Sequence, residues 1–231
     1  MEAIVLAGGY GTRLKAVVPD LPKPMAPIGG RPFLEILLAG LAANGFSRVV
    51  LSLGHMAGVI RKHFGSRYAN MEIVYEIEES PLGTGGAVRQ AMEQVLSDHV
   101  YVLNGDTYLA LEAAAVEQLW NNFHQPIIVA REVSDTSRFG RIEVSDGLVV
   151  KFCEKGIGGG GLINAGCYVL QKATLNSFAL GTPFSMEQDF LEEAVRRSVF
   201  RVFVSHGQFI DIGVPEDYLR AQSELANSIS C

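Results

Sequence analysis

The stretch Leu6-Ala7-Gly8-Gly9-Tyr10-Gly11-Thr12-Arg13-Leu14 begins at the end of a short apolar run, Ala3–Leu6, that is typical of a buried strand. Its glycines allow the backbone to turn tightly and to approach a ligand closely, with N–H groups free to face that ligand. Arg13 and, further on, Lys23 add two cations, and Lys23 lies between two prolines that hold it on a stiff, non-helical segment. Backbone donors and two cations after a first strand predict a cradle for a triphosphate.

Two better-known phosphate-binding loops do not fit this stretch. A P-loop requires Gly-x-x-x-x-Gly-Lys-Ser/Thr, and the chain contains no Gly-Lys-Ser/Thr. The dinucleotide-binding pattern Gly-x-Gly-x-x-Gly could begin at Gly9 and Gly11, but Leu14 occupies the place of its third glycine. A plain glycine-rich turn is the remaining alternative, and the two cations argue against it.

Composition and charge exclude several classes of function. The 231 residues are 48% hydrophobic, which suits a globular core, and the net charge of −6 offers no field to attract nucleic acid or an anionic membrane. No apolar run approaches the roughly 20 residues of a membrane span, and no signal peptide is expected. The three cysteines and five histidines lack metal-ligand spacing, and nothing indicates a disulfide framework, so we expect a cytoplasmic protein.

Predicted strands and helices alternate along the first half of the chain. Their spacing predicts an α/β fold with a mostly parallel sheet in a Rossmann-like, three-layer arrangement. The second half changes character, because Asp146-Gly147 predicts the turn of an antiparallel hairpin. Strands are expected at residues 3–6, 48–53, 71–77, 100–103, 127–131, 140–144, 148–154, 163–170, 199–204 and 208–212. Helices are expected at residues 32–44, 59–64, 84–96, 112–123, 186–197 and 215–226.

Two aspartates stand out among the carboxylates. Asp106 follows the predicted strand 100–103, at the edge where open α/β sheets bind ligands, although a turn or helix cap is the alternative role for it. Asp211 lies among apolar residues of a predicted strand, where an unpaired carboxylate would be costly. Mg²⁺ is usually bound by one or two carboxylates together with water and phosphate oxygens, so we predict that these two bind Mg²⁺. Asp217, on the predicted closing helix, is expected to be solvated.

Three segments, Leu6–Leu14, Leu21–Pro27 and Gly30–Leu34, resemble the signature of the sugar-nucleotidyltransferases. These enzymes form nucleoside diphosphate sugars from a sugar 1-phosphate and a nucleoside triphosphate. The resemblance implies the nucleotide-diphospho-sugar transferase fold, with Mg²⁺ as the cofactor and these two substrates as the partners. We expect one domain over residues 1–231, in which residues 1–135 mainly bind the nucleotide. Residues 136–231 would mainly bind the sugar phosphate, through a small antiparallel portion.

The resemblance also implies which residues form the site. Arg13 would hold the β- and γ-phosphates, Lys23 would bridge the two reacting phosphates, and Asp106 would complete the catalytic set and bind the metal with Asp211. The nucleotide would be bound by Leu6, Ala7, Gly8, Gly9, Gly11, Thr12, Arg13, Lys23, Glu78, Glu79, Pro81, Gly83, Thr84, Gly85, Asn104 and Gly105. The sugar phosphate would be bound by Gly140, Arg141, Glu154, Lys155, Asn164 and Gly166. Gly156 replaces the proline that the family has after the lysine, which changes this wall of the site.

The loop Glu78–Gly86 resembles the family's base-reading segment. Guanine presents two adjacent donors that a carboxylate can accept, whereas uracil and thymine suit an amide better. A glutamate in this loop therefore favours GTP, and Glu78 is preferred to Glu79 by its spacing from Pro81. The alternative is that both glutamates are surface charges.

Within the family, the segments Leu82–Gly86, Asn104–Tyr108 and Phe209–Tyr218 are most similar to the D-glycero-D-manno-heptose 1-phosphate guanylyltransferases. This similarity implies GTP and D-glycero-alpha-D-manno-heptose 1-phosphate as substrates, in surface polysaccharide synthesis. Mannose 1-phosphate with GTP, and glucose 1-phosphate with UTP or dTTP, are the alternatives. A regulatory subunit that binds nucleotide sugars without turnover is an alternative of another class. The sequence is compatible with a homo-oligomer.

Overall fold

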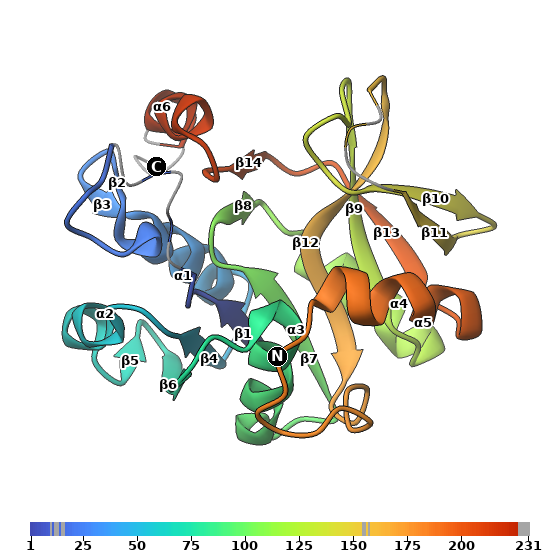
Figure 1. The fold of residues 1–231 in the computed structure, drawn as a ribbon, viewed down its shortest axis with the longest axis horizontal. Helices are drawn as coiled ribbons and strands as arrows, with labels where there is room; N and C mark the ends of the chain where they lie inside the picture. Colours follow the sequence, from blue (N-terminus) through green and yellow to red (C-terminus); the bar gives the residue numbers. More distant parts are fainter. Residues whose placement is uncertain (10, 12–13, 15–16, 154–155, 157, 226–231) are drawn as a thin grey trace.

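The computed structural model describes residues 1–231 apart from residues 10, 12–13, 15–16, 154–155, 157 and 226–231. A ten-stranded sheet runs through the described chain in the order β10-β11-β13-β9-β12-β7-β1-β4-β6-β5 (Figure 1). Its strands are β1 (Glu2–Leu6), β4 (Arg48–Leu53), β5 (Arg67–Tyr68), β6 (Met71–Ile77), β7 (His99–Asn104), β9 (Ile127–Val133), β10 (Arg141–Ser145), β11 (Leu148–Cys153), β12 (Gly161–Gln171) and β13 (Arg201–Ser205). Two small sheets pair β2 (Pro27–Ile28) with β3 (Arg31–Pro32) and β8 (Thr107–Leu109) with β14 (Phe209–Asp211). The α-helices are α1 (Phe33–Ala43), α2 (Ala57–Phe64), α3 (Gly83–Ala91), α4 (Ala113–Phe123), α5 (Glu192–Arg197) and α6 (Pro215–Glu224).

The centre of the sheet is the parallel part that the alternating pattern predicts. Strand β1 pairs in parallel with β4 and β7, so that Ile4 lies opposite Val50 on one side and Val102 on the other. Strand β4 in turn pairs in parallel with β6. Parallel strands end at the same edge of a sheet, so the loops after β1, β4, β6 and β7 are brought together.

The sheet is covered on both faces, as the three-layer prediction requires. Side chains alternate along β1, so Ala3 and Val5 pack on the side of α1, α2, α4 and α6, whereas Ile4 packs on the side of α3 and α5 (Figure 1). All three side chains are fully buried. The predicted fold class is confirmed. Within the described ranges, no helix combines the length and the apolar character needed to cross a lipid bilayer.

The second half of the chain supplies the antiparallel portion. Strand β12 runs antiparallel between β7 and β9, and β10 and β11 form the predicted hairpin. Asp146 and Gly147 both have positive φ values, 51° and 75°, which a tight hairpin turn requires. Because β10 also pairs with β12, and β11 with β13, these strands close into a ring with β9.

Two expected helices differ in form from the structure, and one strand pairing was not predicted. The helix expected at residues 84–96 ends as α3 at Ala91 and continues only as the 3₁₀ turn Met92–Gln94. The helix expected at residues 186–197 begins as a π-helix, Met186–Leu191, before α5. The pairing of β8 with β14 was not predicted, since a strand as short as β8 carries no periodic pattern. This pairing sets Asp211 opposite Thr107, next to Asp106.

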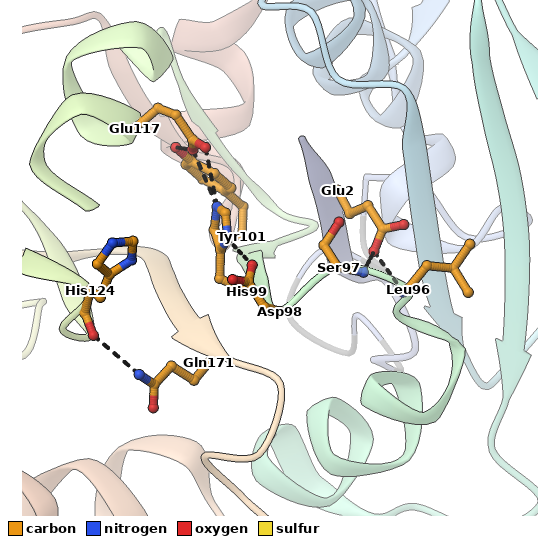
Figure 2. A network of polar contacts seen from close by, with 9 residues as sticks. All are labelled: Glu2, Leu96, Ser97, Asp98, His99, Tyr101, Glu117, His124 and Gln171. Atoms are coloured by element: carbon orange, nitrogen blue, oxygen red, sulfur yellow. Dashed lines mark hydrogen bonds and ion pairs between the residues drawn. The ribbon is translucent and has the colours of Figure 1, made fainter. Parts of the chain in front are cut away.

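The amino-terminal ends of β1 and β7 are held by a network of polar contacts (Figure 2). The Glu2 carboxylate accepts hydrogen bonds from the amides of Leu96 and Ser97, at 2.8 and 3.0 Å. The buried Tyr101 hydroxyl donates to Glu117 at 2.8 Å, and His99 lies between Asp98 and Glu117, at 2.7 and 3.2 Å. His99 also stacks on the Trp120 ring, with a centroid distance of 4.5 Å. The carboxylates at this edge of the sheet therefore have protein partners.

Candidate active site

A cavity of about 520 Å³ lies at the opposite edge, where β1, β4, β6 and β7 end. Most of the predicted nucleotide-binding residues line it. These are Leu6, Ala7, Gly8, Gly9, Lys23, Glu78, Glu79, Pro81, Gly83, Thr84, Asn104 and Gly105, with Asp106 beside them. Lining residues that sequence reasoning missed are Pro24, Gly54, His55, Ser80 and Ala87. Gly54 and His55 directly follow β4. Because β4 lies parallel to β1, the residues after both strands meet at the same edge of the sheet, and this is the signal that could have identified Gly54 and His55.

Two glycines of the cavity lining, Gly8 after β1 and Gly105 after β7, are packed too closely to carry side chains. A Cβ atom on Gly8 would lie 2.9 Å from Glu78 Oε1, 3.0 Å from the Gly54 amide nitrogen and 3.2 Å from the Leu53 carbonyl carbon. A Cβ atom on Gly105 would lie 2.5 Å from the Leu6 carbonyl oxygen, which accepts a hydrogen bond from the Gly105 amide at 2.8 Å. The floor of the cavity is therefore backbone, so a ligand there meets amide groups at short range.

Glu78 is held in the lining of the cavity by two hydrogen bonds to the backbone. Its amide donates to the Leu53 carbonyl oxygen at 2.8 Å, and its Oε2 accepts a hydrogen bond from the Leu82 amide at 2.9 Å. Burial raises the pKa of Glu78, and the Leu82 hydrogen bond opposes this shift in part. Glu79, in contrast, is exposed. The carboxylate that faces the cavity from a fixed position is thus that of Glu78.

The residues after Pro81 form the first turn of α3. Thr84 does not cap this helix, which begins at Gly83; its Oγ1 instead accepts a hydrogen bond from the Met186 amide at 2.9 Å. Gly85 is not among the cavity-lining residues, because it packs under the Phe184 ring and donates its amide to the Phe184 carbonyl at 2.9 Å. The glycine at this position is explained by packing between α3 and the segment that precedes the π-helix.

Lys23 and Asp106 line the cavity together, and Asp211, which is not part of the lining, lies beside them in one corner. Lys23 Nζ lies 2.6 Å from Asp106 Oδ2, and only 11% of the Lys23 side chain is exposed. Asp211 is joined to this pair through the backbone, since the Ile212 amide donates to the Asp106 carbonyl oxygen at 2.9 Å. Burial raises the pKa of Asp211, and so does the charge of Asp106, while a hydrogen bond from the Gly213 amide and the charge of Lys23 lower it. The corner gathers two carboxylates and one ammonium group.

Gly11 belongs to the same corner without lining the cavity. It has a φ of 58°, and a Cβ atom on it would lie 2.8 Å from Lys23 Cβ. Glycine is therefore needed there so that the segment carrying Lys23 can pass. The predicted residues Thr12 and Arg13 lie outside the described residues, so of the four side chains expected to converge the structure places three.

The donor set of this corner fits a magnesium ion. Two carboxylates are the number of protein ligands that Mg²⁺ commonly takes, the rest of its octahedral shell being water and phosphate oxygens. The mutual repulsion of Asp106 and Asp211, which raises the pKa of Asp211, is the kind that a divalent cation relieves. Within the part of the chain that the structure describes, no cluster of three or more histidine, cysteine or acidic residues offers a protein-only metal cage.

The described members of the predicted sugar-phosphate set, Gly140, Arg141, Asn164 and Gly166, belong to the antiparallel portion and are not in the lining of this cavity. The Asn164 amide donates to the Gly140 carbonyl oxygen at 3.0 Å, and its side chain donates to Tyr168 and to Glu187, at 2.6 and 3.0 Å. A Cβ atom on Gly166, whose φ is 70°, would lie 2.5 Å from Asn104 Nδ2. Gly166 thus brings β12 against Asn104, which lines the cavity.

Arg141 begins β10, opposite Ile163 and Cys153. The two charged residues predicted to bind the sugar phosphate, Glu154 and Lys155, lie outside the described residues.

Asp217 corrects one prediction. The solvated position expected for it is wrong, because the residue is only 5% exposed. Its Oδ2 pairs with Arg138 Nη2 at 2.5 Å and its Oδ1 with Arg220 Nη2 at 3.3 Å. Arg138 lies 79 residues earlier in the chain, so no local pattern marks this contact.

Comparisons with known proteins agree on one family. The nucleotidyl transferase family model matches residues 2–228. The D-glycero-alpha-D-manno-heptose 1-phosphate guanylyltransferase of Aneurinibacillus thermoaerophilus is 40% identical over 230 residues, which cover 99% of this chain and all of the relative. The enzyme of that name from Campylobacter jejuni is 41% identical over 219 residues, 94% of this chain and 97% of the relative. The crystal structure of HddC from Yersinia pseudotuberculosis complexed with GMP-PN is 38% identical, with a TM-score of 0.86, and covers 97% of this chain and 99% of that chain.

Proposed function

We propose, from the premise that the chain belongs to the nucleotidyl transferase family, that it transfers GMP from GTP to D-glycero-alpha-D-manno-heptose 1-phosphate. The products are a GDP-sugar and pyrophosphate. The observation that carries the proposal is that one cavity is lined by the Glu78 carboxylate and by the Lys23–Asp106 pair, with Asp211 next to that pair. A guanine nucleotide laid along the backbone floor between them would reach the charged corner with its phosphates.

Glu78 is the residue that we assign to guanine. An ionised carboxylate accepts from both the N1–H and the N2 amine of guanine, and this charge-assisted pair leaves no donor of the base edge unmet. The Leu82 amide fixes the Glu78 side chain, so little side-chain entropy is lost when the base binds. The name of the Yersinia structure, which contains GMP-PN, supports a guanine nucleotide for this fold at 38% identity.

The reaction that we propose is an in-line attack by an oxygen of the sugar 1-phosphate on the α-phosphorus of GTP, with pyrophosphate leaving. The nucleophile is already ionised, so no general base is needed, and the difficulty is the repulsion between two anions. Lys23 would bridge the α-phosphate and the incoming phosphate, and its 2.6 Å ion pair with Asp106 supports this role by fixing its ammonium group. Asp106 and Asp211 would hold Mg²⁺, which supplies further neutralisation of phosphate charge.

The other assignments follow from the sequence motifs. Arg13 would hold the β- and γ-phosphates, and Lys155 and Glu154 would bind the sugar phosphate with Asn164 and Gly166. In this division, residues 1–135 mainly serve the nucleotide and residues 136–231 mainly serve the sugar. We place the enzyme in the cytoplasm, with the described cysteines Cys153 and Cys167 as free thiols.

The test is pyrophosphate release from purified protein and Mg²⁺, with each of GTP, ATP, UTP and dTTP against heptose, mannose and glucose 1-phosphates. We expect the highest kcat/KM for GTP with the heptose 1-phosphate. A higher value with mannose 1-phosphate would change the assigned sugar, and a higher value with UTP or dTTP would overturn the role of Glu78. Tight GTP binding without pyrophosphate from any sugar phosphate would overturn the enzymatic proposal in favour of a binding subunit.

A further inference from the structure

The loop of residues 134–140, between β9 and β10, joins two parts of the molecule that the proposed reaction must align. On one side it is bonded to the segment after β11. The Thr136 amide donates to the Gly159 carbonyl oxygen at 3.0 Å, and the Gly156 amide donates to the Ser137 carbonyl oxygen at 3.0 Å. The Gly140 carbonyl oxygen accepts from the Asn164 amide of β12 at 3.0 Å. These bonds attach the loop to the wall proposed for the sugar phosphate.

On its other side the same loop contacts β14, which contains Asp211, and α6, which follows it. Arg138 pairs with Asp217 of α6 at 2.5 Å. The Phe139 ring packs edge-on against Phe209 of β14, with a centroid distance of 5.8 Å and an interplanar angle of 68°. Phe209 precedes Asp211 by two residues, and Asp217 follows it by six. The loop therefore contacts the chain on both sides of a proposed metal ligand.

The Arg138–Asp217 pair joins a half-exposed guanidinium to a buried carboxylate. The Asp217 side chain is only 7% exposed, so its charge requires a partner, and Arg138 provides the shorter of its two contacts. The guanidinium also lies within the field of Asp211 and Glu216. Three negative charges thus favour the place that Arg138 occupies.

We propose that Arg138 is a positioning residue, which together with Asp217 forms a latch that aligns the sugar-phosphate wall with the carboxylates that bind the metal. The inference rests on the function proposed above for this site. Arg138 acts through the loop and need not touch either substrate. Opening of the latch would let loop 134–140, and with it Gly156 and Gly159, move relative to β14.

The experiment compares Arg138→Ala with Arg220→Ala, a matched control. Both variants remove one arginine from Asp217, but the 3.3 Å contact of Arg220 lies within α6 and does not involve the loop. We expect Arg138→Ala to lower kcat/KM for the sugar phosphate about tenfold or more, since misplacement of a reacting group by about 1 Å can cost up to 10²-fold. GTP affinity, measured by calorimetry, should stay unchanged. Arg220→Ala should leave both quantities unchanged, and Arg138→Lys should restore part of the loss.

Two further readouts separate a latch from other roles. If the pair acts as a unit, Asp217→Asn should reproduce the loss, and the double variant should be no worse than either single variant. Losses that add would mean that Arg138 binds substrate directly, and equal effects of Arg138→Ala and Arg220→Ala would mean that only the charge of Asp217 matters. Either result overturns the latch.

Hydrogen exchange tests the latch without any substrate. The amides of Thr136 and Gly156 should exchange faster in Arg138→Ala than in Arg220→Ala, at unchanged melting temperature, and equal rates would overturn the proposal. If the wild-type protein releases no pyrophosphate but these rates differ as expected, the proposed function fails while the latch stands. If Arg138→Ala does not fold, the same comparison is made with Arg138→Gln, which removes the charge and keeps a side chain of similar length.

Discussion

The carboxylates near the amino-terminal ends of β1 and β7 differ in their surroundings from those near the carboxyl-terminal edge of the sheet. At the amino-terminal ends, Glu2 accepts two backbone hydrogen bonds and Glu117 accepts from Tyr101 (Figure 2). A hydrogen bond from His99 lowers the pKa of Asp98 there. At the carboxyl-terminal ends, burial raises the pKa of Glu78 and of Asp211. One end of the sheet is stabilised by carboxylates that protein donors hold, whereas the other keeps two carboxylates whose ionised forms burial disfavours, and a substrate or a metal can supply further partners there.

The largest effect should come from removing a charge at the cavity end. Asp106→Asn should cut turnover on the order of 10²-fold or more, because it removes a metal ligand and the partner that holds Lys23. The free energy of unfolding should change by less than about 1 kcal/mol, because the Asp106 side chain is 41% exposed and its ion pair is partly screened by solvent. Pyrophosphate release and urea unfolding measure the two quantities. Turnover near that of the wild type would remove Asp106 from the proposed site.

The next effect should come from Glu78→Gln. The glutamine amide retains an acceptor for the Leu82 amide but cannot accept from both guanine donors. The loss of a hydrogen bond to a charged group costs about 1.5–3 kcal/mol. KM for GTP should therefore rise about tenfold to hundredfold. KM for ITP, which lacks the N2 amine, should rise less. An equal rise for both nucleotides would contradict a contact between Glu78 and the amine.

The same residue gives the site a pH dependence. Guanine binding requires the ionised carboxylate, and burial raises the pKa of Glu78. As pH falls, KM for GTP should therefore begin to rise at a higher pH than it would for a glutamate of ordinary pKa. For folding the sign is opposite. The raised pKa means that the contribution of Glu78 to stability is present at low pH and is lost as pH rises through that pKa. Glu78→Gln should therefore flatten the KM profile without lowering the melting temperature at neutral pH.

A third comparison uses two neighbouring glycines. Gly8→Ala places a methyl group 2.9 Å from Glu78 Oε1 and 3.0 Å from the Gly54 amide, whereas a Cβ atom on Gly9 meets no atom within 4 Å. Gly8→Ala should lower the free energy of unfolding by about 1–3 kcal/mol, as overpacking does. Gly9→Ala should be close to neutral in the absence of ligand. Equal stabilities of the two variants would show that the loop after β1 can shift to accommodate a methyl group at residue 8, and that the cavity floor is not rigid.

The sequence was sufficient for features that depend on short spacings. Strands β4 and β6 agree with their predicted bounds residue for residue, because both are short, largely apolar segments that lie between polar and glycine-containing turn segments. The positions of Glu78 and Asp106 around one cavity follow from the parallel order of β1, β4, β6 and β7, because the two residues come just after β6 and β7. These side chains lie at or just after the ends of short local patterns.

Contacts between distant segments were beyond such reasoning. Asp217 was expected in solvent because its helix position is polar, and its burial follows from Arg138, which lies in a loop without a pattern. Gly11 and Gly85 look like ligand-binding glycines in sequence, but in the structure they make room for Lys23 and Phe184. The requirement for glycine at such a position becomes visible only when the neighbouring residue that a side chain would contact is known.

The smallest effect should come from the amino-terminal end. Tyr101→Phe removes the hydrogen bond to Glu117 at 2.8 Å but leaves Glu117 with His99, so the free energy of unfolding should fall by about 1 kcal/mol. Burial, together with the Glu117 carboxylate, raises the pKa of Tyr101, so the hydroxyl is a donor at all working pH values and the loss should not depend on pH. Turnover should be unchanged, because Tyr101 lies on the network at the far end of β7 from Asn104. If turnover falls although most of the protein remains folded, the polar network at the amino-terminal ends is coupled to the cavity through β7. That result would contradict the division of roles between the two ends of the sheet.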